Sequence, residues 1–169
     1  MCRLIIASDD RLSTDAILRV APNPPHWSRA IAGNISFLID TGADVTCLSA
    51  LDAERFQIYT DNLEEAGPIA GLNGSVMSYK LPEVQISFID EIANGFIKYH
   101  IEEIDYIRVA ELPGESDEPP KIFGLLGLDI MRFFDLSTDR ENNIAYLKRI
   151  RLQEGKYRYA RLPMPRTTP

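Results

Sequence analysis

The stretch Phe37-Leu38-Ile39-Asp40-Thr41-Gly42-Ala43-Asp44 decides how this sequence can fold. Three apolar residues lead directly into an aspartate and a Thr-Gly pair follows, which is the pattern of a buried strand that ends in a tight turn. Such a turn presents the Asp40 carboxylate at the end of an apolar strand. Because apolar surroundings disfavour an ionised carboxylate, this placement indicates a chemical role.

The segments around this stretch predict an all-β fold with one or two short helices, because apolar runs alternate with turn residues throughout the chain. The Ile-rich segment 96–109 also fits helical spacing, but its β-branched and aromatic content favours a strand. Ser49 is placed to cap a short helix. We expect strands over residues 4–7, 17–20, 45–48, 76–88, 144–147 and 157–162, a hairpin over 30–39 that turns at Gly33-Asn34, a second short helix over 129–134, and loops over 61–68, 90–95 and 112–120.

The length of 169 residues and the ordinary composition predict one domain over 1–169. Within it we distinguish an N-terminal extension (1–29), a core (30–147) and a basic C-terminal strand and tail (148–169). The net charge of −7 argues against a nucleic-acid-binding protein. Nucleic-acid contact stays a minor option for the basic tail alone.

The remaining composition gives no sign of a metal, a cofactor or a membrane partner. Cys2 and Cys47 form no disulfide framework, so we expect a cytoplasmic protein with Cys47 as a small buried side chain. No apolar run approaches the length of a transmembrane helix. His26 and His100 are far apart and have no Asp or Cys at ligand spacing, so we expect no metal and no cofactor.

Two motifs together resemble the retropepsin-like aspartic protease family. That family has an Asp-Thr/Ser-Gly-Ala turn at the end of an apolar strand and, later in the chain, two hydrophobic residues and a glycine before a short helix. Here Asp40 to Ala43 and Leu125-Leu126-Gly127 match these motifs, and Gly71 to Gly74 falls where the family has its flap hairpin. The resemblance covers about residues 30–147. It implies a closed β barrel that forms one half of a dimer.

The resemblance also implies a role for each matching residue. Asp40 would be the catalytic acid and base, Thr41 would hold the paired active-site strands rigid across the dimer, and Gly42 would donate its N–H to the carboxylate. Residues that would contact substrate are Ala43, Asp44, Gly71, Leu72, Asn73, Gly74 and Ser75, and residues that would pack under the active-site loop are Leu125, Leu126 and Gly127.

A single Asp-Thr-Gly makes this chemistry depend on two chains. One ionised carboxylate must activate a water molecule while a second, protonated carboxyl polarises the scissile carbonyl. Because the sequence holds one such motif, a symmetric partner must supply the second aspartate. We therefore expect a homodimer that acts on a peptide or protein substrate.

One position departs from the viral members of this family. Leu128 stands where viral members usually have an arginine that pairs with the acid at the Asp44 position, so the chain looks closer to cellular or prokaryotic members. Two hypotheses stay open. The first is an aspartic endopeptidase that works best below neutral pH, and the second is an inactive member of the fold that binds peptides or only dimerises. In the second case Asp40 is a structural turn residue, and Gly71 to Gly74 is an ordinary hairpin turn.

Overall fold

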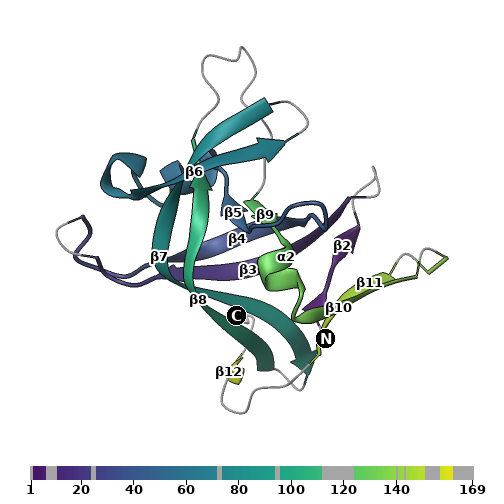
Figure 1. The fold of residues 1–169 in the computed structure, drawn as a ribbon. Helices are drawn as coiled ribbons and strands as arrows, with labels where there is room; N and C mark the ends of the chain where they lie inside the picture. Colours follow the sequence, from purple (N-terminus) through teal and green to yellow (C-terminus); the bar gives the residue numbers. More distant parts are fainter. Residues whose placement is uncertain are drawn as a thin grey trace, which may run out of the picture.

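The computed structural model of this chain describes residues 2–6, 11–23, 26–71, 74–93, 96–111, 124–139, 141–142, 144–150 and 157–161. Strands dominate them, as Figure 1 shows, and the predicted all-β class is confirmed. The strands are β1 (Cys2–Arg3), β2 (Ile5–Ile6), β3 (Leu12–Val20), β4 (Ile31–Ile39), β5 (Cys47–Leu48), β6 (Glu64–Gly71), β7 (Gly74–Ala93), β8 (Phe96–Ala110), β9 (Gly124–Leu126), β10 (Phe134–Asp139), β11 (Ile144–Arg149) and β12 (Tyr157–Arg161). The helical segments are α1 (Ala50–Arg55), the 3-10 turn η1 (Thr60–Asn62) and α2 (Leu128–Met131).

Six strands close into a barrel, as the resemblance implies. Their order is β8-β5-β9-β4-β3-β7, and the sheet closes because β7 also pairs with β8. β6 and β12 extend this sheet beside β7 and β8, and β2 pairs with β3. Closure removes the exposed strand edges that an open sheet would leave. Figure 1 shows β7 and β8 running side by side along the length of the molecule.

Alternate residues of the barrel strands fill its interior. This follows from the two-residue period of a strand, which sends successive side chains to opposite faces of the sheet. The apolar residues that are 2% exposed or less on these strands are Ala16, Leu18, Val20, Ile35, Phe37, Leu48, Leu81, Val84, Ile86, Phe88, Ile107, Val109 and Leu126. Phe88 also packs edge-to-face on Phe134, with ring centroids 5.5 Å apart. The core therefore lies inside the barrel and extends towards β10.

β4 is one continuous strand, so the predicted hairpin over 30–39 is wrong. Gly33 pairs with Leu18 of β3, and Asn34 pairs with Ile17. A Cβ atom on Gly33 would lie 2.5 Å from Cε1 of the Phe56 ring. The glycine is needed for this close packing, and the turn composition of Gly-Asn misled the sequence-based prediction.

Two other local predictions are confirmed. The segment 96–109 is a strand, and Ser49 caps α1 through its Oγ, which accepts a hydrogen bond from Asp52 N at 3.1 Å.

The predicted loop over 61–68 is wrong, because β6 begins at Glu64. The second helix, α2, starts one residue earlier and ends sooner than predicted, since Phe134 already belongs to β10. The predicted loop over 112–120 lies outside the described residues.

β3 comes from the segment that the sequence assigns to an N-terminal extension. It lies between β4 and β7 in the barrel, and its Leu18 and Val20 side chains are fully buried. The barrel therefore includes residues that precede residue 30. The division of the chain into extension, core and tail stays a prediction.

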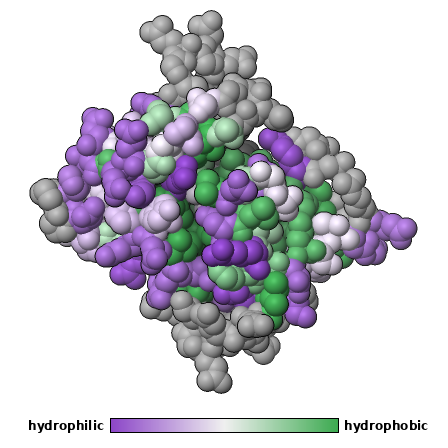
Figure 2. All heavy atoms as spheres, viewed as in Figure 1, coloured by the Kyte–Doolittle hydropathy of each residue, from purple (hydrophilic) through white to green (hydrophobic). Residues whose placement is uncertain are grey.

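A second, three-stranded sheet in the order β1-β11-β10 lies beside the barrel. β10 has one buried residue, Phe134, and its next five residues are exposed. Large apolar side chains reach the surface in this part of the molecule: Leu128 is 40% exposed, Leu136 38% and Ile150 52%. Figure 2 shows apolar surface among hydrophilic areas on the face that carries α2 and β10.

A buried ionic cluster joins the small sheet to the barrel. Glu102 of β8 is 7% exposed, and its Oε1 accepts a 2.6 Å hydrogen bond from Nε of Arg149 in β11. Nε2 of His100 lies 2.6 Å from the same oxygen. Burial raises the pKa of Glu102, but the hydrogen bond with His100 and the charge of Arg149 outweigh it, and the net shift is downward. The cluster therefore stabilises the carboxylate form.

This lowered pKa makes a testable contribution to stability. A carboxylate with a lowered folded-state pKa stabilises the fold above its ordinary pKa of 4.5, and this contribution is lost as the pH falls through the folded-state value. We expect the free energy of unfolding to fall more steeply below about pH 5 in the unmodified protein than in Glu102→Gln. Urea unfolding at a series of pH values measures both curves, and parallel curves would contradict the prediction.

Candidate active site

β4 delivers Asp40 to the end of the barrel. Asp40 N donates to Leu126 O at 3.2 Å, so the parallel pairing of β4 with β9 continues to this residue. The chain then turns sharply, with Ala43 N donating to Asp40 O at 3.2 Å. Gly42 N donates to Asp40 Oδ1 at 2.9 Å, the contact that the motif implies. In one chain Asp40 is half-buried, while Thr41, Gly42 and Asp44 are exposed.

The segment Leu125-Leu126-Gly127 lies beside this turn, as the resemblance implies. Leu125 pairs with Leu38 and Leu126 with Ile39, although more than 80 residues separate them in the sequence. Beyond β9, Leu128 N donates to Ala43 O at 2.8 Å. The turn that carries Asp40 is therefore supported through its backbone by β9 and by the start of α2.

A hydrogen-bonded network of Thr46, Asp129 and Gly127 locks the turn in place. Thr46 donates to Asp129 Oδ1 through its N–H at 2.9 Å and through its hydroxyl at 2.7 Å. The same hydroxyl accepts from Gly127 N at 3.0 Å. Thr46 is fully buried, so each of these polar groups depends on the others for a partner. This network could not be predicted from local sequence patterns, because Thr46 and Asp129 lie 83 positions apart in the chain.

Gly127 lies where two backbone segments nearly touch. A Cβ atom there would be 2.5 Å from Val45 C, 2.6 Å from Val45 O and 2.9 Å from Ala43 O. These are backbone atoms of the active-site loop and cannot rotate away as a side chain can. A glycine at this position therefore allows the loop to cross α2.

Asp44 follows the turn and has no basic partner. Within the part of the chain that the structure describes, its carboxylate forms no ion pair and accepts no hydrogen bond. Its backbone carbonyl accepts from Asp129 N at 3.2 Å, which fixes the main chain. The exposed Leu128 side chain cannot replace the arginine of viral members. The Asp44 carboxylate therefore lies open to solvent in a single chain.

β6 and β7 form a hairpin at the position where the resemblance implies a flap. Ala70 pairs with Ser75, and Gly71 with Gly74, next to the tip; Leu72 and Asn73 lie outside the described residues. At the base of the hairpin, Ser78 Oγ donates to Gly67 O at 2.6 Å. Figure 1 shows the hairpin projecting at the top of the molecule, on the side of β5 and β9. The hairpin thus extends from the same region of the barrel as the active-site loop.

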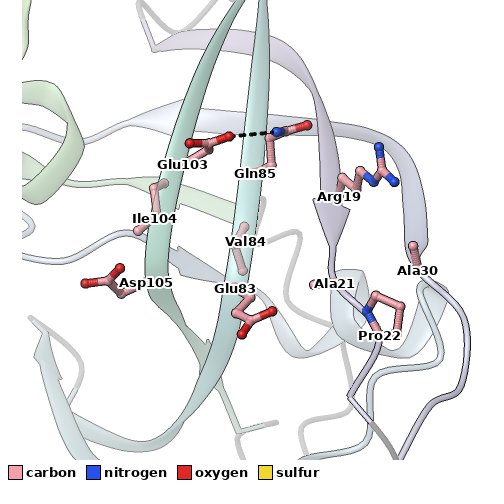
Figure 3. Close-up of a pocket in the computed structure, with 10 residues that line it drawn as sticks. All are labelled: Arg19, Ala21, Pro22, Ala30, Glu83, Val84, Gln85, Glu103, Ile104 and Asp105. Atoms are coloured by element: carbon pink, nitrogen blue, oxygen red, sulfur yellow. Dashed lines mark hydrogen bonds between the residues drawn. The ribbon is translucent and has the colours of Figure 1, made fainter. Parts of the chain in front are cut away.

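Three of the surface cavities in the described part of the chain have volumes of about 430, 350 and 450 Å³, and none of these three is lined by Asp40, Thr41 or Gly42. Figure 3 shows the first of them, which lies against β3, β7 and β8 and contains Arg19, Glu83 and Asp105. Gln85 Nε2 lies 3.5 Å from Glu103 Oε1 in this cavity. The second cavity borders the loop that follows the Asp40 turn, because Val45, Thr46 and Asp129 line it.

The described residues support neither a cysteine nucleophile nor a metal site. Burial raises the pKa of the Cys47 thiol to about 11, so Cys47 stays protonated and is no nucleophile at neutral pH. Among the described residues, no three His, Cys, Asp or Glu side chains are grouped to hold a metal ion. The helices in this part of the chain are also too short to cross a bilayer.

Comparison with known proteins gives one family match. The model of a family described as "gag-polyprotein putative aspartyl protease" matches residues 31–132. A search of curated protein sequences gives no significant match.

The solved structures that are similar to this chain include two proteases. A retropepsin-like aspartic protease from Rickettsia conorii is 18% identical, and the match covers 86% of this chain and 87% of that one with a TM-score of 0.47. EIAV protease in complex with the inhibitor HBY-793 is 18% identical, with 74% and 88% covered and a TM-score of 0.43.

The network around Thr46 predicts a difference between two substitutions. Thr46→Val removes the hydroxyl and leaves both Asp129 and Gly127 N short of a buried partner, so we expect a loss of about 1–3 kcal/mol in the free energy of unfolding. Thr46→Ser keeps the hydroxyl and removes one methyl group, so its loss should be about 1 kcal/mol or less. Chemical denaturation of both variants tests this, and an equal loss would show that the hydroxyl contributes little.

The close approach at Gly127 predicts a second difference. Gly127→Ala forces a methyl group against the backbone of Ala43 and Val45, and we expect a loss of about 3 kcal/mol in stability. Gly33→Ala is the matched control, since its methyl group meets a half-buried Phe56 ring that can shift. Thermal unfolding should show a clearly lower midpoint for Gly127→Ala than for Gly33→Ala, and similar midpoints would contradict the prediction.

Proposed function

The chain belongs to the gag-polyprotein aspartyl protease family, and we propose that it is one subunit of a homodimeric aspartic endopeptidase. The observation that carries this proposal is the geometry at Asp40. The carboxylate stands at the end of an apolar strand, accepts the Gly42 N–H, and is held by a second strand that the family motif also contains. The proposed substrate is a peptide or protein chain.

Two copies of Asp40 would share one proton across the two-fold axis of the dimer. Two carboxylates a few ångströms apart cannot both be charged, so the pair titrates as a unit. The ionised member takes a proton from water, whose oxygen attacks the scissile carbonyl, while the protonated member donates to the carbonyl oxygen. Collapse of the tetrahedral intermediate breaks the C–N bond, and the amine leaves with a proton from the pair.

The environment of Asp40 supports a fixed reaction geometry. Gly42 N donates to Asp40 Oδ1 at 2.9 Å and so orients the carboxylate at the turn. The backbone support from β9 and α2 fixes the position of the turn. Reaction geometry of this kind depends on distances controlled to a fraction of an ångström.

The exposure of the turn in one chain supports the need for a partner. Thr41 and Gly42 are exposed, and Asp40 lines none of the three cavities described above. A substrate groove of normal depth would form only between two copies. The exposed apolar side chains of Leu128, Leu136 and Ile150 also suit a surface that a second copy covers.

Substrate contacts are proposed for the loop and the flap. Ala43 and the open Asp44 carboxylate would contact the substrate backbone, and the hairpin from Gly71 through Leu72, Asn73 and Gly74 to Ser75 would close over it. The Gly-rich tip suits such movement because glycine permits many backbone conformations.

One observation favours a second candidate function. Leu128 removes the arginine that in viral members pairs with the acid at the Asp44 position, so this loop lacks one of their ionic contacts. A dimer with a less rigid loop would bind peptides without cleaving them. The two candidates differ in whether cleavage occurs and whether it depends on Asp40.

Asp40→Asn should abolish cleavage and leave the dimer intact. Asparagine keeps the size of the side chain but can neither accept nor release the proton, so we expect a fall in kcat/KM of about 10³-fold or more. The measurement is cleavage of a randomised peptide library between about pH 4 and 7, with dimerisation checked by sedimentation.

Asp105→Asn is the matched control, since this exposed acid lines the cavity of Figure 3, and it should cleave like the unmodified protein. A dimer that cleaves nothing, or cleavage that survives Asp40→Asn, would refute the proposed function. The first result would favour the peptide-binding candidate.

A further inference from the structure

We propose that Arg108 makes the substrate groove selective for peptides that carry an Asp or Glu side chain a few residues from the scissile bond. This inference rests on the proposed function, because it assigns a substrate class to the same groove. It is carried by the position of Arg108 in the sheet and by the lack of an ion pair between Arg108 and any described carboxylate.

The sheet register puts Arg108 on the same face as the active-site strand. Arg108 of β8 pairs with Cys47 of β5, Cys47 pairs with Leu125 of β9, and Leu125 pairs with Leu38 of β4. Side chains of directly paired residues point to the same face of a sheet. Asp40 follows Leu38 by two residues and still makes a strand-type hydrogen bond to Leu126 O, so its side chain belongs to that face as well.

The opposite face of these strands is the barrel core. Ile107 and Val109, the neighbours of Arg108 along β8, are 1% and 0% exposed, and Leu48 and Leu126 are both 0% exposed. The guanidinium therefore points out of the core, towards the side on which a peptide would lie.

Arg108 reaches the base of the flap. Its Nη1 donates to Ser78 Oγ at 3.4 Å, and Ser78 Oγ donates in turn to Gly67 O of β6 at 2.6 Å. This places a positive charge between the active-site side of the barrel and the hairpin proposed to cover the substrate. A peptide held under the hairpin would pass within reach of it.

Arg108 forms no ion pair with a carboxylate of the described ranges, although Glu102, Glu103, Asp105 and Asp129 line the same cavity. Its Nε is buried and has no hydrogen-bond partner. Lys80, directly opposite on β7, already pairs with Glu64 at 2.6 Å. Like charges opposite each other on paired strands are destabilising, and so is a partly buried cation with one neutral partner. A substrate carboxylate next to Arg108 would reduce both the repulsion between the two cations and the cost of burying a cation with one neutral partner.

A carboxylate is the ligand that fits this group. The guanidinium offers several N–H donors in a planar fork that matches two carboxylate oxygens. The chain has a net charge of −7, which disfavours acidic peptides in general, so a local cation has to supply the attraction. The neighbouring Cys47 is only 6% exposed, and this apolar wall strengthens the ionic contact.

The position along the substrate follows from strand spacing. Three strand-to-strand steps separate β8 from β4, or about 14 Å. An extended peptide advances about 3.3 Å per residue. Allowing for the length of the arginine and substrate side chains, the acidic residue lies about two to four positions from the scissile bond.

The test uses a dimer that binds without cleaving. Two randomised peptide libraries, identical except that one has Asp and Glu where the other has Asn and Gln, are offered to Asp40→Asn protein, and retained peptides are counted by mass spectrometry. We expect the acidic library to be retained about tenfold better or more. Arg108→Met in the same background should remove this preference, and Arg108→Lys should keep part of it because the charge remains without the fork.

Arg19→Met is the matched control for the loss of one positive charge, since Arg19 lies in the cavity of Figure 3, and it should keep the full preference. Circular dichroism and sedimentation verify the fold of each variant; if Arg108→Met does not fold, Arg108→Gln replaces it. Equal retention of both libraries, no retention of either, or a preference that survives the loss of Arg108 would overturn the inference.

Cleavage by the unmodified protein separates the two proposals. If it cleaves peptides without an acidic preference, only the role of Arg108 fails. If the acidic library is retained but nothing is cleaved, the proposed function fails and the role of Arg108 stands as peptide recognition.

Discussion

The structure depends on one long-range contact, between the turn that carries Asp40 and the segment that runs from β9 into α2. Thr46 and Asp129 join these segments through buried hydrogen bonds, and Gly127 permits their backbones to approach closely. A buried network of this kind is stable only when every polar member is satisfied. The position of the Asp40 carboxylate is thus fixed by residues that have no chemical role themselves.

This contact also explains why a conspicuous acid can stand at the end of an apolar strand. The strand supplies a rigid base, and the turn moves the carboxylate out of the core to a half-buried position where it can meet a partner. In a single chain the site is therefore a surface feature. The proposed chemistry needs a second copy because one carboxylate cannot both accept and donate the required protons at the same moment.

How far the sequence could predict this fold depends on the range of each signal. The Asp40 turn, the capping of α1 by Ser49 and the strand over 96–109 follow from local patterns, and the structure has all three. The turn predicted at Gly33-Asn34 fails because glycine serves there to admit the Phe56 ring, which is a tertiary contact. The network of Thr46 and Asp129, like the position of Arg108 on the Asp40 face, appears only once the strand register is known.

Two partly buried arginines, Arg108 of β8 and Arg149 of β11, differ in the partners of their guanidinium groups. Arg149 is as buried as the carboxylate that it meets, and it has Glu102 and the Phe133 carbonyl as partners. Among the described residues, the side-chain partner of Arg108 is one neutral hydroxyl at 3.4 Å. Since a cation that only stabilises the fold gains most from a fixed carboxylate, the lack of an ion pair for Arg108 within the described ranges supports a place for a substrate carboxylate beside it.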